Sequence, residues 1–184
     1  MNEVFRSKEE LYFSWYLQQL IENGYVLEFC YEPRTFLLVD PIYKKGKKSP
    51  VQAHPGTNYT PDFLIRWTQK AIGIFIALEL GKPDLSGEYP FVCKGLESWI
   101  DVKGIFKGAH NVSAATFPVK RNLMYHVHEI YVQKIIPVNI TKKKHGGLFP
   151  ETFTPDRYFR TDQSSRMRKF NYIPKTLNVF LGNK

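Results

Sequence analysis

Residues 97–104 read ESWIDVKG, and their alternation of apolar and polar side chains is typical of a β-strand. Residues two apart on a strand point to the same side of a sheet. Ile100 and Val102 should therefore face one layer of the protein, while Asp101 and Lys103 project together on the other side. An acid and a base placed in this way on an apolar strand are a candidate functional pair.

A second apolar strand is predicted upstream, and an acid comes directly before its apolar run. Residues 59–67 read YTPDFLIRW. If neighbouring strands bring Asp62 and Asp101 together, the two carboxylates could hold a divalent cation, since magnesium prefers a few carboxylates and retained waters. The carbonyl of Val102 could add a ligand, and Lys103 would place a positive charge beside an attacking water.

The N-terminal residues 7–25, SKEELYFSWYLQQLIENGY, predict a helix. Ser7 can cap its start and Asn23-Gly24 can end it. Its expected buried stripe consists of the apolar residues at helical spacing, Phe13, Leu17, Leu20 and Ile21. Glu10 lies at the edge of this stripe, where it could complete an acidic cluster. It could instead interact with the positive end of the helix, and Glu9 is the alternative ligand.

Between these elements the sequence predicts further strands and one loop. Residues 25–32 and 34–40 are rich in β-branched and aromatic side chains and predict two strands of a hairpin or meander. Residues 43–58, YKKGKKSPVQAHPGTN, break every periodicity and predict a basic loop. Residues 71–80 predict another strand.

After the ESWIDVKG strand the sequence predicts a helix and then a strand. In residues 117–131 Pro118 suits the first turn of the helix, and Leu123, Val127 and Ile130 form its apolar repeat. Residues 132–140 predict the strand that follows. This order of elements is that of an α/β or α+β domain with a mixed sheet.

Taken together, these residues resemble the PD-(D/E)XK nuclease superfamily. Four positions match the family pattern. Glu10 is an acid on a helix, and Pro61-Asp62 is a PD dipeptide before a strand. Asp101-Val102-Lys103 is a D-x-K on a strand, and Lys120 with Arg121 lies on a basic helix. Within this superfamily the chain is similar to phage endonucleases of the Holliday-junction resolvase type and to transposon end-cleaving endonucleases. The resemblance covers roughly residues 7–137.

The resemblance implies an α/β fold of the restriction-endonuclease-like kind, with a mixed β-sheet flanked by helices. Residues 1–140 would form the nuclease-like core, and residues 141–184 a basic, irregular C-terminal extension of the same domain. The implied activity is metal-dependent hydrolysis of DNA in phage or mobile-element DNA processing, such as recombination, junction resolution or end cleavage. The implied cofactor is Mg²⁺, for which Mn²⁺ would substitute.

The resemblance also implies the roles of individual residues. The catalytic residues would be Glu10, Asp62, Asp101 and Lys103, and the metal ligands Glu10, Asp62, Asp101 and the backbone of Val102. DNA would be the main partner, with a homodimer and an additional protein that directs cleavage as further possible partners. The expected location is the cytoplasm, that of the host cell if the protein is encoded by a phage.

Charge and composition are consistent with a polyanionic partner. The 184-residue chain has a net charge of +9, two cysteines without metal-site spacing and no apolar run long enough to span a bilayer. We expect both thiols to be reduced and mostly buried, and no membrane association. The candidate contacts to nucleic acid, which could also be simply solvated, are Lys44, Lys45, Lys47, Lys48, Lys120, Arg121, Arg166 and Arg168.

One feature departs from the family pattern. The gap between Asp62 and Asp101 is long, and the insert contains Glu79 and Lys82 as a competing acid and base. Their spacing would not place both on one face of a strand, so Asp101 and Lys103 are the preferred pair, and the insert is expected to be an extra strand and a loop. Two other functions stay open: a non-catalytic nucleic-acid-binding protein on the same fold, and a module that binds a host enzyme.

Overall fold

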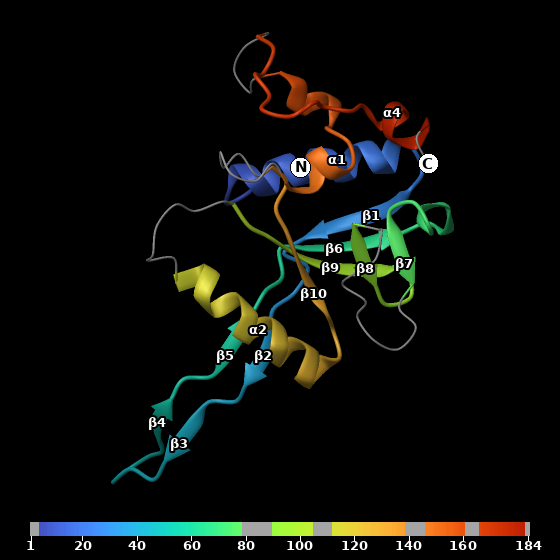
Figure 1. Cartoon of the computed structure of the whole chain (residues 1–184). Helices are drawn as coiled ribbons and strands as arrows, with labels where there is room; N and C mark the ends of the chain where they lie inside the picture. The colour runs from blue at the N-terminus through green and yellow to red at the C-terminus, as the bar shows by residue number, and fades with distance from the viewer. Residues whose placement is uncertain (1–3, 79–89, 105–111, 139–145, 161–165, 183–184) are drawn as a thin grey trace.

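A four-stranded sheet lies at the centre of the protein, with helices on both of its faces (Figure 1). The computed structural model describes residues 4–78, 90–104, 112–138, 146–160 and 166–182. The sheet has the order β1-β6-β9-β10, formed by Val26–Tyr31, Phe63–Trp67, Glu97–Val102 and Val132–Ile135. β1, β6 and β9 are antiparallel and β10 is parallel to β9. The protein is therefore mixed α/β with a mixed sheet, as the sequence predicts.

Helix α1, Lys8–Glu22, covers one face of the sheet. The Ser7 side chain caps it by accepting a hydrogen bond from the backbone N–H of Glu10 at 3.1 Å. The helix ends at Asn23, and Gly24 follows with φ of +75°, a left-handed conformation that glycine adopts without strain. The expected stripe is buried at Phe13, Leu17 and Leu20, whereas Ile21 is only partly buried.

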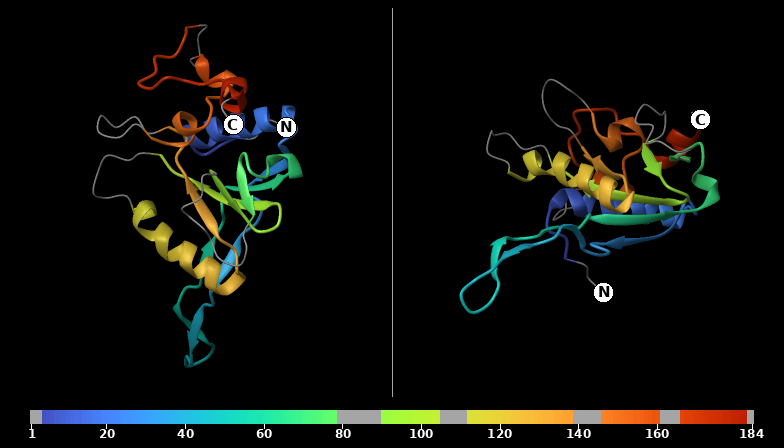
Figure 2. Two further views of the ribbon diagram at one scale, coloured as in Figure 1. Left: turned by 45° about the vertical axis from the view of Figure 1, so that its right-hand side comes forward. Right: turned by 90° about the horizontal axis from the view of Figure 1, so that it is seen from below.

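The C-terminal residues pack on α1, on the side away from the sheet (Figures 1 and 2). They form α3, Leu148–Glu151, the 3-10 helix η2, Asp156–Phe159, and α4, Leu177–Gly182. The ring of Tyr16 in α1 stacks on that of Phe153 with centroids 4.3 Å apart. The buried apolar side chains of this part belong to the main hydrophobic cluster: Leu148, Phe149, Phe153, Tyr158, Leu177 and Phe180. This part of the chain is thus ordered around α1, while the proposed division at residue 140 stays a prediction.

Part of the opposite face of the sheet is covered by helix α2, Val112–His128, together with the paired strands β2, Phe36–Val39, and β5, Thr57–Tyr59. Their buried side chains form a second hydrophobic cluster with β10: Phe36, Leu38, Tyr59, Phe117, Met124 and Val132. The prediction that residues 25–32 and 34–40 pair was wrong, because β1 pairs with β6 and β2 with β5.

Helix α2 also differs from its prediction. It starts at Val112, so Pro118 lies inside the helix and not in its first turn. Among the side chains described in this helix, Phe117 and Met124 are the buried ones. Of the expected apolar repeat, Leu123 and Ile130 are partly buried against the second cluster, although Ile130 lies beyond the helix end. The expectation was wrong for Val127, which is 47% exposed.

A two-stranded arm extends from the body of the protein (Figures 1 and 2). It consists of β3, Ile42–Lys44, and β4, Val51–His54, which pair antiparallel. The sequence predicts a loop here, and that prediction was wrong. Most side chains of the arm are exposed. Because neither face is packed against a core, the alternation that normally identifies a strand is missing.

The connection from β6 to β9 contains the 3-10 helix η1, Gln69–Ala71, and the short strands β7, Ile76–Leu78, and β8, Phe91–Cys93. β7 and β8 pair with each other in parallel and do not extend the central sheet. Glu79 and Lys82, the competing acid and base, lie outside the described residues.

Two simpler expectations concern membranes and thiols. Within the described ranges, no helix is both long enough and apolar enough to cross a membrane. Both cysteines are free, and Cys93 is buried as expected, but Cys30 on β1 is exposed. The prediction of a buried thiol was therefore wrong for Cys30, because α2 covers only part of that face of the sheet and leaves Cys30 beside an open pocket.

Candidate active site

The two predicted aspartates lie at adjacent ends of β6 and β9. In this antiparallel pair Phe63 is opposite Ile100, so the next position in the same register places Asp62 opposite Asp101. The long insert connects the two strands at their other end. Its length therefore does not separate the two acids, and the preference for Asp101 and Lys103 over Glu79 and Lys82 stays a prediction.

Hydrogen bonds and one ion pair hold the two carboxyls in place. Oδ2 of Asp62 accepts a hydrogen bond from the backbone N–H of Val102 at 2.7 Å, and the Asp101 carboxyl is close enough for its charge to raise the pKa of Asp62. The Tyr59 hydroxyl donates to Oδ2 of Asp101 at 2.7 Å. The Lys103 ammonium forms an ion pair with Oδ1 of Asp101. Asp101 and Lys103 thus project on the same side, as the alternation of the strand predicts.

The electrostatics of this acidic cluster follow from its burial. Asp101 is only 3% exposed. Burial, and then the charge of Asp101, raise the pKa of Asp62 to about 8. Burial and the charge of Asp101 also raise the pKa of Tyr59, which keeps its hydroxyl a hydrogen-bond donor. At neutral pH the Asp62 carboxyl therefore holds its proton more readily than an exposed aspartate does.

Basic side chains from neighbouring elements surround the cluster. The Lys120 ammonium of α2 lies 5.8 Å from the centroid of the Tyr59 ring, and the charge of Arg121 acts to lower the pKa of Tyr59. On β10, Lys134 is paired with Asp101 in the sheet register, and residues directly opposite each other share a face. A phosphate group placed over the aspartates would therefore meet positive charge from α2 and β10.

Glu10 has different partners. Its Oε2 accepts hydrogen bonds from the backbone N–H of Arg6 at 2.9 Å and from the Tyr31 hydroxyl at 2.6 Å. This is close to a capping box, in which an acid in the first turn binds backbone N–H groups before the helix. The neighbouring Glu9 carboxylate lies against the backbone just after β9, since a Cβ atom added at Gly104 would meet Glu9 Oε1 at 2.9 Å.

Replacing Glu10 with alanine should lower the free energy of unfolding by about 1–3 kcal/mol, because the Tyr31 hydroxyl and the Arg6 N–H would lose their acceptor. Urea denaturation of the metal-free protein measures this. Glu22→Ala, at the exposed C-terminal end of the same helix, is the matched control and should change the stability by less than about 0.5 kcal/mol. Equal stability of the two variants would show that the Glu10 contacts contribute nothing.

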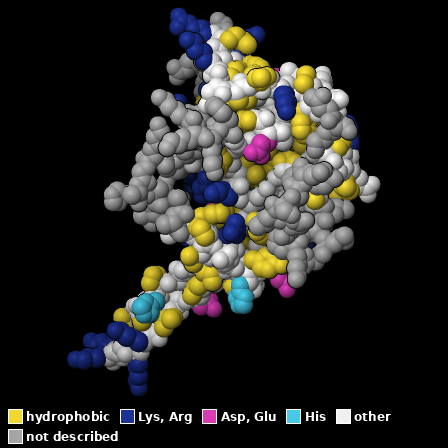
Figure 3. All heavy atoms as spheres, in the orientation of Figure 1, with side chains coloured by type: hydrophobic (Ala, Val, Ile, Leu, Met, Phe, Trp, Pro, Cys, Tyr) yellow, Lys and Arg dark blue, Asp and Glu magenta, His cyan; other side chains and the backbone are white. Residues whose placement is uncertain are grey.

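The remaining candidate contacts to nucleic acid are distributed over distant surfaces. The lysines at 44–48 lie at the tip of the arm, and Figure 3 shows Lys and Arg side chains gathered there, at the opposite end of the molecule, and between the two. Arg166 is exposed. Arg168 has a role in packing, because its Nε donates to the Tyr158 carbonyl at 3.0 Å and its guanidinium lies 4.1 Å from the centre of that ring.

Two residues at the site were not singled out by sequence. In the sequence Tyr59 is predicted only as the start of a strand, and Lys134 only as part of the last strand. A signal exists for Tyr59, since it precedes the PD dipeptide in the same short segment. For Lys134 the burial pattern of the strand gives no such signal, and only the register with β9 shows that it lies beside Asp101.

The side chains at the site provide some of the ligands that a divalent cation needs. Two carboxylates are adjacent, and among the described residues no hydrogen-bond donor satisfies the buried Oδ1 of Asp101, which meets the Lys103 ammonium by charge. In the same described residues no three acidic, histidine or cysteine side chains are grouped as a metal site. Asp62 and Asp101 are thus brought together without Glu10. The ligand roles of Glu10 and of the Val102 carbonyl stay predictions.

Comparisons of the chain with protein-family models, with curated proteins and with solved structures give no significant match. A function must therefore be inferred from the residues of this chain and their geometry.

Proposed function

We propose that this protein is a Mg²⁺-dependent DNA endonuclease built on a restriction-endonuclease-like core. The observation that carries the proposal is the meeting of Asp62, Asp101 and Lys103 at the ends of two antiparallel strands. Two carboxylates and a lysine are the groups that hydrolysis of a phosphodiester bond requires, and here they are adjacent and largely shielded from water.

Each group has a distinct role in this proposal. Asp62 and Asp101 would bind the cation, which when bound supplies charge stabilisation and a more acidic water. Their mutual repulsion, visible in the raised pKa of Asp62, favours a divalent cation over two unpaired charges. Lys103 would orient the attacking water and stabilise negative charge on the phosphate. Tyr59 fixes the Asp101 carboxylate through its hydrogen bond.

The basic surfaces would bind the phosphate backbone without reading sequence. The net charge of +9 favours such binding. Lys120 and Arg121 lie beside Tyr59 of the acidic cluster, and the arm carries its lysines away from the body of the protein (Figure 3). DNA that contacts both would extend along the face that carries α2, β2 and β5.

Exchanging the four arm lysines for glutamine (Lys44, Lys45, Lys47 and Lys48) should weaken DNA binding and flatten its salt dependence. Each phosphate contact contributes about −0.9 to the slope of log K against log salt on duplex DNA, so the slope should become shallower by up to about 3.6. Fluorescence anisotropy over a salt titration gives this value. An unchanged slope would mean that the arm lysines are merely solvated. Asp101-dependent cleavage at low salt should survive in this variant.

The proposed activity is tested with a panel of DNA substrates in Mg²⁺ or Mn²⁺: plasmid, linear duplex, single strands, flaps and four-way junctions. Cleavage of at least one of them is expected, and the ranking gives the substrate class. Processing of phage or mobile-element DNA, by junction resolution or end cleavage, would be indicated by preference for branched DNA or for specific ends. Absence of cleavage on every substrate would contradict the proposal.

A non-catalytic nucleic-acid-binding protein is the second candidate. It is favoured by the internal pairing of the site, since Asp101 already has Lys103 and Tyr59 as partners and Glu10 is bound to Tyr31. In that case the acids would be structural, and the protein would bind DNA equally well with and without divalent cations. DNA cleavage that depends on a divalent cation would favour the nuclease, whereas DNA binding that is the same with and without cation, and without cleavage, would favour the non-catalytic protein.

A further inference from the structure

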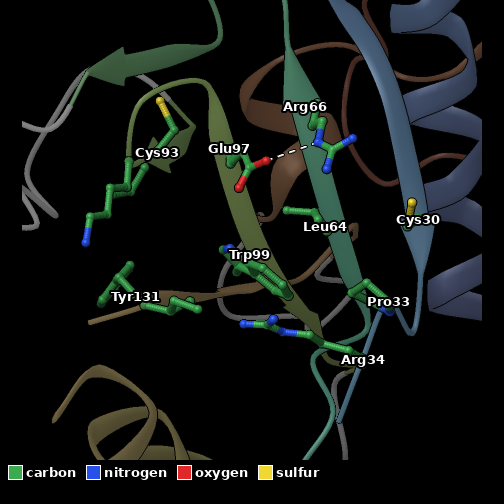
Figure 4. A pocket seen from close by; sticks show the side chains of 12 residues that line it. Cys30, Pro33, Arg34, Leu64, Arg66, Cys93, Glu97, Trp99 and Tyr131 are labelled. Atoms are coloured by element: carbon green, nitrogen blue, oxygen red, sulfur yellow. Dashed lines mark hydrogen bonds and ion pairs between the residues drawn. The ribbon is translucent and has the colours of Figure 1, made fainter. Parts of the chain in front are cut away.

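A pocket of about 590 Å³ opens on the sheet face that carries Asp101, beside the part covered by α2 (Figure 4). Its size is in the range of about 300–1,000 Å³ found for small-ligand sites. The pocket lies over β1, β6 and β9, and the residues that matter most for its chemistry are Cys30, Arg34, Leu64, Lys94, Trp99 and Tyr131.

The pocket borders the acidic cluster directly. Trp99 precedes Asp101 by two positions on β9, so both side chains project from the same face about 7 Å apart. Leu64 stands in the same relation to Asp62 and is opposite Trp99 in the register. Since B-DNA advances 3.4 Å per nucleotide along one strand, a nucleotide next to a phosphate at the aspartates lies within reach of Trp99.

The lining combines an aromatic surface with an available positive charge. In Figure 4 the Trp99 ring lies in the middle of the pocket, with the Arg34 guanidinium beside it and Tyr131 across from it. The guanidinium lies 4.2 Å from the centre of the Phe36 ring and 5.9 Å from that of the Trp99 ring, and it makes no ion pair with any described residue. Arg121 lies 5.7 Å from the Tyr131 ring and so connects the pocket with the cluster.

The other charges around the pocket are already neutralised. Arg66 forms ion pairs with Glu28 on β1 and with Glu97 on β9, the latter at 3.0 Å. Lys94 is paired with Glu129 at 3.5 Å. The ligand chemistry is therefore set by the Trp99 ring and by Arg34: a flat aromatic group that carries an anionic substituent nearby.

We propose that the pocket receives one unpaired nucleobase of the DNA strand whose phosphate lies at Asp62 and Asp101. The inference rests on the proposed nuclease function and names its substrate class: DNA with an unpaired nucleotide beside the cleaved bond, as at a gap, flap or branch point. A base in an intact duplex is stacked and paired, so placing it on Trp99 costs the energy of extruding it. A base that is already unpaired avoids this cost, and stacking on an aromatic side chain stabilises it.

The test measures binding without cleavage, in EDTA at constant salt. The probes are two duplexes of equal length, one fully paired and one with a single unpaired 2-aminopurine, whose fluorescence changes on stacking. The unpaired probe should bind more tightly to the wild-type protein. Trp99→Ala should weaken that binding about 10- to 100-fold and leave the paired duplex unchanged, while Trp99→Phe keeps most of the preference. Trp15→Ala, on the helix that covers the other face of the sheet, is the matched control.

A second measurement needs no substitution. Cys30 is exposed at the pocket and Cys93 is buried, so a maleimide should react first with Cys30. DNA with an unpaired nucleotide should slow this reaction, whereas fully paired duplex should not. Equal protection by both DNAs, or a Trp99→Ala protein that is folded and keeps the full preference, would overturn the proposal.

The two proposals fail in different ways. If the protein cleaves paired and unpaired DNA at equal rates, the pocket proposal is wrong and the nuclease stands. If the protein prefers the unpaired probe in EDTA but cleaves nothing in Mg²⁺, the nuclease proposal is wrong, and the pocket belongs to a nucleic-acid-binding protein.

Discussion

Asparagine in place of Asp101 should abolish cation-dependent DNA cleavage, with a rate at least about 10³-fold below that of the wild type. Asp101 is buried, accepts a hydrogen bond from Tyr59 and forms an ion pair with Lys103, so its charge cannot be replaced by another side chain nearby. The amide keeps the shape of the carboxyl but loses the negative charge that a cation requires. Single-turnover cleavage of the best substrate from the panel is the measurement.

DNA binding separates this effect from misfolding. Binding of the same substrate in EDTA should be unchanged or slightly stronger for Asp101→Asn, because a negative charge facing the phosphate has been removed. The matched control is Glu97→Gln on the same strand and face, four positions away, where the acid is paired with Arg66. Glu97→Gln should retain cleavage within about threefold. Equal loss in both variants, or retained cleavage in Asp101→Asn, would exclude the proposed site.

The central strands could be predicted because each carries its own signal. β6 and β9 are apolar runs with an acid at a fixed position, and α1 has a cap, a buried stripe and a glycine stop within one segment. Local sequence is enough for such elements, since periodicity and capping act over a few residues. The alternation along β9 also predicts that Asp101 and Lys103 lie on one side of the strand.

What sequence could not supply was long-range pairing. The sequence favours pairing of β2 with β1 because the two are adjacent in the chain, but β2 pairs with β5 across the arm. Nothing local distinguishes these partners, because pairing depends on which apolar side chains meet in three dimensions. For the same reason Lys134 was missed: its proximity to Asp101 arises from a parallel register between strands more than thirty positions apart.

The helical acid shows a different limit. Glu10 matched the expected spacing, yet a position one turn into a helix suits both a capping acid and a metal ligand, so the spacing alone could not decide. The Tyr31 hydroxyl that binds Glu10 comes from β1, and burial and the hydrogen bond to Glu10 raise the pKa of Tyr31. That contact depends on how β1 passes α1, which the sequence does not encode locally.

Asparagine in place of Asp62 should stabilise the metal-free protein, and more so as the pH rises. The pKa of this carboxyl is raised from 3.8 to about 8 by burial and by Asp101, so between these values the native state holds a proton that the unfolded state has lost. The stability of the wild type must then fall as the pH rises through this interval. The amide of the Asp62→Asn variant does not titrate in this range. The difference in unfolding free energy should therefore grow from near zero at about pH 4 to a few kcal/mol, on the order of 1.4 kcal/mol per pKa unit.

Divalent cations should reverse this order, which makes the measurement a test of the site as well as of its electrostatics. A cation that binds the ionised pair in the native state stabilises the wild type by about 2.7 kcal/mol at a concentration 100 times its Kd, and binding should tighten with pH as the proton leaves. Asp62→Asn should gain nothing from Mg²⁺ or Mn²⁺.

Asp40→Asn, at an exposed acid, is the control and should behave as the wild type does. Thermal unfolding at several pH values, with and without cation, gives all the curves. A wild type that is not destabilised between pH 5 and 8 would mean that Asp62 is ionised there without cost. A wild type insensitive to the cation would mean that the paired aspartates, however close, do not form a metal site, and that the acids serve the fold of a nucleic-acid-binding protein.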